Sequence, residues 1–192
     1  MNHRVKNLFA VTSSIVNLNA RTAQSPQALA AAVTERLTAL GRAHALTMTD
    51  ASFRQEHHAT MQGLAEAILG PYEQEGQRRI FISGNDFELA ATSITPLALL
   101  LYEFATNASK YGSLAHEAGR VELTFALSGE KVNVLWRESG GAKLAPEGEP
   151  GFGTRLVEAT VSQLGGRMNR VWHESGLSLE LVLAKNLLVP TE

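Results

Sequence analysis

The sequence predicts an α+β protein in which a helical region precedes a sheet. Up to about residue 70, apolar residues recur at the three-four spacing of a helix face. After about residue 78, several runs alternate between apolar and polar residues, and most of the glycines, which favour turns, lie there. We therefore expect a helical region at 1–70 and an α/β sandwich at 71–192.

The first part is expected to fold as a helical hairpin. Apolar residues from Val5 to Val16 share one face of a first helix. Ser25 and Pro26 then form a start signal for a second helix, which should run to about Thr47. Because two helices bury little apolar surface alone, the hairpin should either pair with a second copy as a four-helix bundle or fold back on the rest of the chain. Monomer and dimer both remain open.

The second part is expected to combine helices and strands in one layered unit. A third helix should run from about Gln55 to the break at Gly70-Pro71, and Thr95-Pro96 should open a strongly apolar fourth helix. The remaining expected elements are a helix at 151–164 and strands at 79–83, 121–127, 131–136, 168–172 and 177–183. This order predicts mostly antiparallel strands with helices on one face of the sheet.

The composition is that of a globular domain and excludes several kinds of chemistry. Of the 192 residues, 44% are hydrophobic and 19% charged, and Phe125 and Trp172 read as core residues. The absence of cysteine excludes disulfides and thiolate sites, and the net charge of −2 disfavours nucleic acid as a partner. No apolar run reaches the roughly 18 residues that span a bilayer. The N-terminus lacks a secretory signal, so the expected location is cytoplasmic.

A first candidate for chemistry is the segment His3-Arg4-Val5-Lys6-Asn7. On a helix, His3 and Asn7 lie one turn apart on the same face. A neutral imidazole can attack a γ-phosphate, and an amide one turn later can hold a water or an acceptor aspartate. The motif is short, so it is equally the pattern of an exposed N-terminal histidine without a role.

A second candidate is a polar stripe on the fourth helix, formed by Glu103, Asn107, Lys110 and Tyr111. The amide oxygen of Asn107 suits Mg²⁺, which prefers oxygen ligands together with phosphate oxygens and water. Lys110 can contact phosphate and Tyr111 can cover a base or ribose. Glu103 can polarise a metal-bound water or orient a nucleophile. The alternative interpretation is an ordinary solvated helix face.

Two further candidates are rich in glycine. Trp136 and Glu138 lie at a strand end, followed by Gly140 and Gly141; the carboxylate can accept a hydrogen bond from the amine of adenine, and the glycines allow close approach to a flat ring. Downstream, Gly151, Gly153 and Thr154 lead into a helix whose free N–H groups favour phosphate. Alone, the first reads equally well as a β-turn with a packed tryptophan, and the second is a weak motif.

Taken in order, these four motifs resemble those of the HWE family of histidine kinases. His3 falls at the phospho-acceptor of the family's first box. The second box is matched by Glu103, Asn107, Lys110 and Tyr111, the Trp-x-Glu box by Trp136 and Glu138, and the last glycine box by Gly151 and Gly153. The resemblance covers nearly the whole chain.

The resemblance implies a fold and a set of roles. It implies a Bergerat-type ATP-binding domain behind a dimerisation and phosphotransfer hairpin, with ATP and Mg²⁺ as cofactors and a response-regulator receiver domain as partner. Asn107 would ligate Mg²⁺, Glu138 would read the adenine amine, and Gly141 to Gly153 would frame an ATP lid. One position departs from the family: Tyr102 stands where the family has a histidine.

Three functions remain open from the sequence. The leading hypothesis is a protein-histidine kinase core that autophosphorylates His3 and passes the phosphoryl group to a regulator aspartate. The alternatives are a histidine phosphotransfer protein with a degenerate ATP domain and a non-catalytic module that docks a regulator. Because the chain begins two residues before His3, we expect the upstream half of the first helix and any sensor to be missing, as in an excised fragment.

Overall fold

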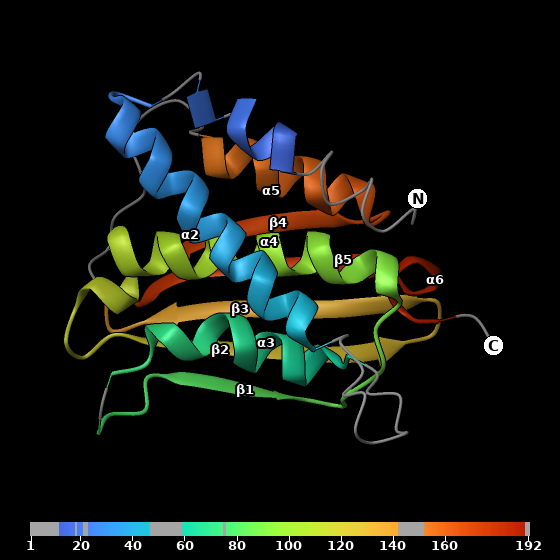
Figure 1. Ribbon diagram of the computed structural model, residues 1–192. Coiled ribbons are helices and arrows are strands. Elements are labelled where there is room, and N and C mark those ends of the chain that lie inside the picture. Colours follow the sequence, from blue (N-terminus) through green and yellow to red (C-terminus); the bar gives the residue numbers. More distant parts are fainter. Residues whose placement is uncertain are drawn as a thin grey trace.

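A five-stranded mixed sheet forms one layer of the computed structural model, which describes residues 12–17, 19–20, 23–46, 59–74, 76–141 and 152–190 (Figure 1). Its strands are β1 (Ile80–Gly84), β2 (Arg120–Ser128), β3 (Lys131–Ser139), β4 (Arg167–His173) and β5 (Gly176–Ala184). The strand order is β1-β2-β3-β5-β4. Only the β1–β2 pair is parallel among these neighbours. This confirms the predicted α+β class and its mostly antiparallel sheet.

Helices α3 (Met61–Leu69), α4 (Ala91–Lys110) and α5 (Phe152–Gln163) cover one face of the sheet (Figure 1). Along β3, and along β2 as far as Phe125, every second residue is buried, as the alternation predicts. The register places Leu123 opposite Trp136 and Phe125 opposite Val134 on the buried face. Phe104 of α4 contacts Trp136 with ring centroids 5.6 Å apart. The core therefore lies between the sheet and α4, and Phe125 is confirmed as a core residue.

Helix α2 (Pro26–Ala45) begins where the sequence indicates. The Ser25 side-chain oxygen accepts a hydrogen bond from the Ala28 amide at 3.1 Å, and Pro26 occupies the first turn. Residues 12–17 and 19–20 are also helical, so the described part of the first region agrees with a hairpin. Short helical turns η1 (Gly70–Tyr72), η2 (Ser113–Ala115) and α6 (Lys185–Leu188) complete the described elements; α6 was not expected.

Helix α3 starts later than the sequence suggested. Thr60 has an extended backbone and caps the helix, because its side chain accepts a hydrogen bond from the Gly63 amide at 3.2 Å. The expected start near Gln55 is therefore wrong. The cap depends on the extended backbone at Thr60, which the helical periodicity of the sequence does not reveal.

Helix α4 starts earlier than expected, at Ala91, and Pro96 lies inside it. The first turn is held by tertiary contacts: the Ala90 amide donates to the Leu188 carbonyl at 2.7 Å, and the Ser93 hydroxyl donates to the same carbonyl at 3.2 Å. A proline normally opens a helix because it lacks an N–H. Here α6 stabilises the helical turn before Pro96, so α4 does not start at Thr95-Pro96.

Helix α2 packs across α4 on the side away from the sheet (Figure 1). Its buried residues are Arg36, Ala39, Leu40 and Ala43, so the contact combines small apolar side chains with one charged residue. Within the described chain, the helical region thus folds back on the sheet domain. The alternative of a four-helix bundle with a second copy stays a prediction. None of the described helices is long and apolar enough to cross a bilayer.

Candidate functional site

A cavity of about 1250 Å³ lies where α2, the second half of α4, the start of α5 and strands β3 to β5 meet. Most of the described site residues predicted from sequence converge on it: Glu103, Asn107, Lys110, Tyr111, Glu138, Gly153 and Thr154. These residues come from three segments that are far apart in sequence. Their convergence on one hollow is the main structural support for a common site.

The polar stripe of α4 runs from the protein interior to the cavity mouth. Glu103 is only 2% exposed, Asn107 is half-buried, and Lys110 is exposed. Tyr111, which follows the helix, is 74% exposed. The stripe therefore offers a buried carboxylate, an amide one turn later, and a cation and an aromatic ring at the opening.

Glu138 is held in place by two protein donors. The Trp136 indole N–H donates to Oε1 at 3.1 Å, and the Ser113 amide donates to Oε2 at 2.8 Å. Residues two apart on a strand point to the same face, which explains why Trp-x-Glu spacing lets the indole reach the carboxylate. Each carboxylate oxygen can accept more than one hydrogen bond, and Glu138 lines the cavity. The buried carboxylate can therefore still accept a donor from a ligand.

Gly140 and Gly141 pack against a neighbouring loop and do not belong to the residues that line the cavity. Gly140 has a φ of 73°, and a Cβ there would lie 2.4 Å from the Ala118 carbonyl oxygen. At Gly141 a Cβ would lie 2.9 Å from Ser113 Cα. Close backbone packing explains both glycines, and their predicted contact with a cofactor stays a prediction.

The start of α5 lies directly against the buried end of the α4 stripe. A Cβ at Gly153 would lie 2.6 Å from Glu103 Oε2, so any larger residue there would have to displace the Glu103 carboxylate. Thr154 follows on the cavity wall. The predicted residues His3, Asn7 and Gly151, and the expected lid at 142–150, lie outside the described residues.

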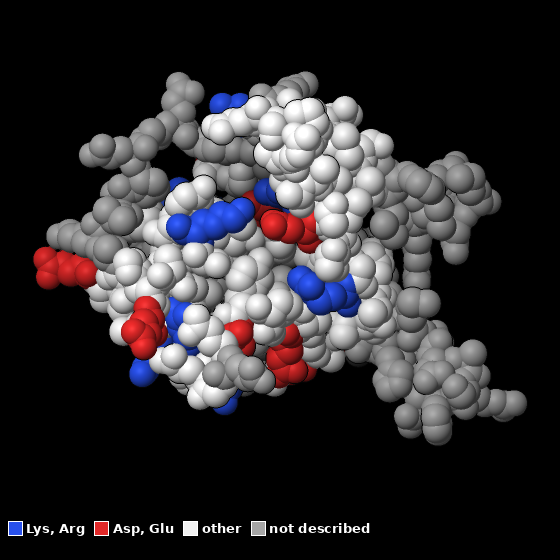
Figure 2. Space-filling view, turned by 60° about the vertical axis from the view of Figure 1, so that its left-hand side comes forward, with Lys and Arg blue, Asp and Glu red and all other residues white. Residues whose placement is uncertain are grey.

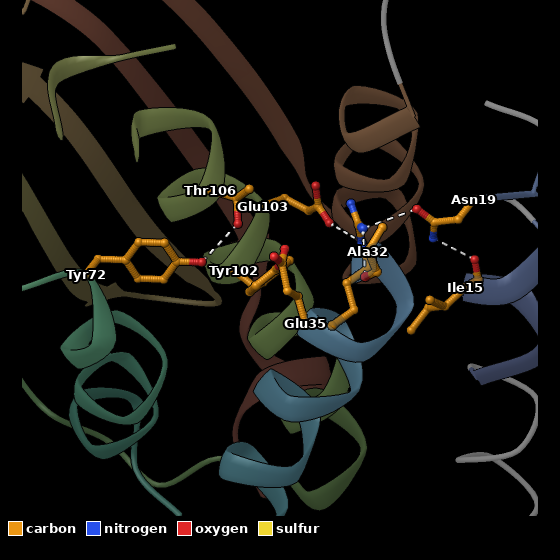
Figure 3. Close-up of polar contacts among 9 residues, drawn as sticks. Ile15, Asn19, Ala32, Glu35, Tyr72, Tyr102, Glu103 and Thr106 are labelled. Atoms are coloured by element: carbon orange, nitrogen blue, oxygen red, sulfur yellow. Dashed lines mark hydrogen bonds and ion pairs between the residues drawn. The ribbon is translucent and has the colours of Figure 1, made fainter. Parts of the chain in front are cut away.

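A polar network that was not predicted from sequence joins the helical region to Glu103 (Figure 3). Arg36 Nε of α2 forms an ion pair with Glu103 Oε1 at 2.7 Å, and Arg36 Nη1 donates to Asn19 Oδ1 at 3.2 Å. Asn19 Nδ2 in turn donates to the Ile15 carbonyl at 2.7 Å. The sequence signal was available: Arg36 lies three residues after Val33 and four before Leu40, which places a charge on the apolar face of α2.

Tyr102 joins the same interface. Its hydroxyl donates to Glu35 Oε2 at 2.9 Å, and the Arg36 guanidinium lies 5.7 Å from its ring centroid. Burial is the main cause that raises the pKa of Tyr102 well above the ordinary tyrosine value. The phenol is therefore a neutral hydrogen-bond donor to Glu35. Glu35 and Arg36 of α2 thus contact Tyr102 and Glu103 of α4.

Two further cavity residues from β4, Arg170 and Trp172, were missed. Trp172 was expected in the core but is 39% exposed, so that expectation is wrong. The reason is that β4 is an edge strand, paired only with β5 in the described sheet, and its burial pattern is mostly exposed. Position in the sheet, which the alternation of the strand does not reveal, decides the exposure of Trp172.

Charge around the site is mixed. On the face shown in Figure 2, basic and acidic side chains are interspersed among uncharged residues and form no extended patch of one sign. Within the described part of the chain, no group of three or more His, Cys, Asp or Glu residues could hold a metal. The donor set still fits Mg²⁺ bound with a phosphorylated ligand, because Mg²⁺ often takes only one or two protein ligands plus phosphate oxygens and water. Asn107 is the half-buried amide on the cavity wall that could serve.

Comparison with known proteins shows similarity to histidine kinases. A family model described as HWE histidine kinase matches residues 1–86. The blue-light-activated histidine kinase 1 of Erythrobacter litoralis is 34% identical over 95% of this chain and 51% of that protein. The blue-light-activated histidine kinase of Rhizobium johnstonii is 33% identical over 94% of this chain and 51% of that protein. The chain thus spans about half the length of these relatives.

The fold is also shared with solved structures. A histidine kinase domain of the Erythrobacter litoralis blue-light-activated kinase superposes with a TM-score of 0.61 at 17% identity, covering 91% of this chain and 94% of that one. The similarity in fold accompanies the match to the family model over residues 1–86 and the sequence similarity over almost the full chain. The chain thus matches the HWE histidine kinase family over residues 1–86 and is similar to blue-light-activated histidine kinases over almost its full length.

Proposed function

We propose that this chain is the catalytic core of a protein-histidine kinase that transfers the γ-phosphoryl group of ATP to His3 and then to an aspartate of a response-regulator receiver domain. The observation that carries the proposal is the convergence of Glu103, Asn107, Lys110 and Glu138 on one cavity. Its volume of about 1250 Å³ leaves ample room for a nucleotide.

The residues at the two ends of the cavity suggest how ATP would lie. Glu138, fixed by Trp136 and Ser113, would accept a hydrogen bond from the exocyclic amine of adenine. Tyr111 at the mouth would cover the base or ribose, and Lys110 would contact phosphate. The first amides of α5, near Gly153 and Thr154, would contribute further donors to phosphate.

Asn107 would hold Mg²⁺ together with the phosphates. When bound, Mg²⁺ would neutralise charge on the phosphate oxygens. The neutral imidazole of His3 would attack the γ-phosphorus, a new P–N bond would form, and the bond to the β-phosphate oxygen would break to release ADP. Glu103 would orient the nucleophile. Because positioning and charge stabilisation dominate phosphoryl transfer, a rigid cavity wall is the main contribution expected from the protein.

The second transfer would move the phosphoryl group from the His3 nitrogen to a regulator carboxylate. The P–N bond would break as an acyl phosphate forms. Asn7, one turn from His3, would hold the acceptor aspartate or a water. We also propose that residues 1–70 form the phosphotransfer region and residues 71–192 the ATP-binding domain, and that the helical hairpin supports a homodimer. Sedimentation of the chain decides the last point.

Autophosphorylation with γ-labelled ATP tests the proposal. Wild type should incorporate label with Mg²⁺, His3→Ala should not, and Asn107→Ala should lose most incorporation. Asn133→Ala is a matched control, because Asn133 is exposed on β3 and does not line the cavity. Label that persists in His3→Ala at the wild-type level would contradict the assignment of the acceptor.

The alternative of a phosphotransfer protein with a degenerate ATP domain has one residue in its favour, Tyr102 in place of the family histidine. Titration with Mg–ATP separates the two functions. Submillimolar binding would exclude the degenerate domain. Absence of binding would leave only phosphotransfer or regulator docking.

A further inference from the structure

Arg79 is a buried cation that the proposed reaction does not use. It lies just before β1 and is 2% exposed. Its Nε donates to the Gly119 carbonyl at 2.9 Å and its Nη2 to the Leu114 carbonyl at 3.1 Å, and the same nitrogen also contacts the His116 carbonyl. A buried guanidinium is costly to desolvate unless its donors are satisfied. Here backbone carbonyls of a single loop, residues 112–119, satisfy them.

The 112–119 loop is one wall of the Glu138 pocket. The Ser113 amide donates to Glu138 Oε2 at 2.8 Å, and Gly112 approaches so closely that a Cβ would lie 2.1 Å from the same oxygen. The Ser113 hydroxyl donates to the Arg120 carbonyl at 3.0 Å, which ties the loop to β2. The cavity is lined by Gly112, Ala115 and His116 of this loop. Any movement of the loop would therefore change both the position of the Glu138 carboxylate and the shape of the cavity wall.

Arg79 is well suited to fix this loop in one conformation. The three carbonyls that it binds, at residues 114, 116 and 119, turn inward toward one guanidinium. A planar guanidinium presents several N–H donors in a fixed fork, whereas a lysine ammonium offers a single flexible point charge. The Arg79 amide is itself anchored, since it donates to Glu73 Oε2 at 2.8 Å, and the Ile80 amide donates to Oε1 of the same carboxylate. The anchor and the fork together connect β1 to the loop.

We propose that Arg79 is a positioning residue for base selectivity. By holding the 112–119 loop, it keeps the Ser113 amide on Glu138 Oε2, so that the carboxylate presents its remaining acceptor capacity to the exocyclic amine of a purine. The inference rests on the proposed role of Glu138 in binding adenine. It adds that selectivity depends on a residue that lies outside the cavity lining.

Binding of Mg–ATP and Mg–ITP to the full chain tests this inference, because inosine carries a carbonyl where adenosine carries the amine. Wild type should prefer ATP by about tenfold or more, the effect of one hydrogen bond to a charged group. Arg79→Met should reduce this preference to within about threefold, mainly by weakening ATP binding, and Arg79→Lys should retain only part of it. In turnover, the ATP KM should rise more than kcat falls.

A neighbouring residue provides the matched control. Arg78 is exposed and contacts the Phe81 ring rather than the loop, so Arg78→Met should keep the wild-type preference. If Arg79 variants do not fold, Gly119→Ala tests the same loop with the charge in place. A Cβ at Gly119 would lie 1.7 Å from the Ser113 carbonyl oxygen, so Ser113 must shift and the preference should fall.

The outcomes separate this inference from the proposed function. A wild type that binds ATP and ITP equally would contradict the role of Glu138 and remove the inference with it. A wild-type preference that survives in Arg79→Met, or in Gly119→Ala where that variant decides, would contradict the inference alone. Equal losses for both nucleotides would mean that Arg79 stabilises the domain without affecting selectivity, which would also overturn it.

Discussion

The ion pair between Arg36 and Glu103 predicts a specific pattern of stability in a double-mutant cycle. The pair joins α2 to α4 at 2.7 Å, and the two side chains are 10% and 2% exposed. Removing one member of a buried pair leaves the other charge uncompensated, which costs about 3–5 kcal/mol, whereas replacing both by apolar residues is near neutral or stabilising. Arg36→Met and Glu103→Met should therefore each lower the free energy of unfolding by about 3–5 kcal/mol.

The double variant should behave very differently from the sum of the single ones. Arg36→Met with Glu103→Met leaves no buried charge at the interface, although it loses the hydrogen bond from Arg36 to Asn19 and the contact with the Tyr102 ring. These two losses cost about 1–2 kcal/mol together. The double variant should thus lie within about 2 kcal/mol of wild type, so the coupling energy should exceed about 3 kcal/mol.

Urea unfolding followed by circular dichroism measures all four proteins. Arg42→Met serves as the control on the same helix, because Arg42 has a buried Nε without a described hydrogen-bond partner. Because this Nε has no described hydrogen bond to lose, the substitution should not lower the free energy of unfolding by more than about 1 kcal/mol. Additive effects of the two single substitutions, or an Arg36→Met protein as stable as wild type, would refute the reasoning that this pair holds α2 on α4.

Three other predictions concern the cavity and its surroundings. Of the two tryptophans, Trp136 is fully buried and Trp172 is 39% exposed on the cavity wall, so Mg–ATP should change tryptophan fluorescence and Trp172→Phe should remove most of the change; an undiminished signal would contradict a contact between the nucleotide and Trp172. Gly153→Ala should slow autophosphorylation on the order of tenfold or more in single-turnover assays, because its Cβ would displace the Glu103 carboxylate; a wild-type rate would contradict the need for this approach. Because burial raises the pKa of Tyr102, the unfolded state loses the proton first, so the stability that this residue contributes is complete below about pH 10 and declines as pH rises above it. Urea unfolding from pH 8 to 11 should therefore show a smaller alkaline loss for Tyr102→Phe than for wild type, and equal losses would contradict that origin.

Much of the fold could be predicted because its signals are local. The cap at Ser25, the alternation along β2 and β3, and the glycine at the β2–β3 turn each depend on a few neighbouring residues. Gly129 has a φ of 57°, a conformation that glycine adopts readily. The starts of α3 and α4 could not be predicted from periodicity, because Thr60 caps α3 at a point inside the expected helix and α6 stabilises a turn before Pro96.

The candidate site also contains residues that the sequence could identify and residues that it could not. Glu103, Asn107 and Lys110 could be identified from their spacing, since the helix repeat places them on one face of α4. Glu138 could be identified from its spacing to Trp136 on a strand and from the order of the motifs. Their partners could not. Arg36 and Arg79 lie 35 or more residues away from Glu103 and from the loop carbonyls that they bind, and Asn19 lies 17 residues from Arg36.

By itself, the sequence determined which segments become helix or strand and which residue types carry the proposed chemistry, because both depend on side-chain spacing and backbone preference over a few residues. Only the tertiary structure decided that α2 lies on α4, that Trp172 faces a cavity and that a buried arginine holds the loop beside Glu138. These features depend on which surfaces meet when the core closes. The cost of burying a charge without a partner selects, among the arrangements that the local patterns allow, the one in which Arg36, Arg79, Glu103 and Glu138 are all satisfied.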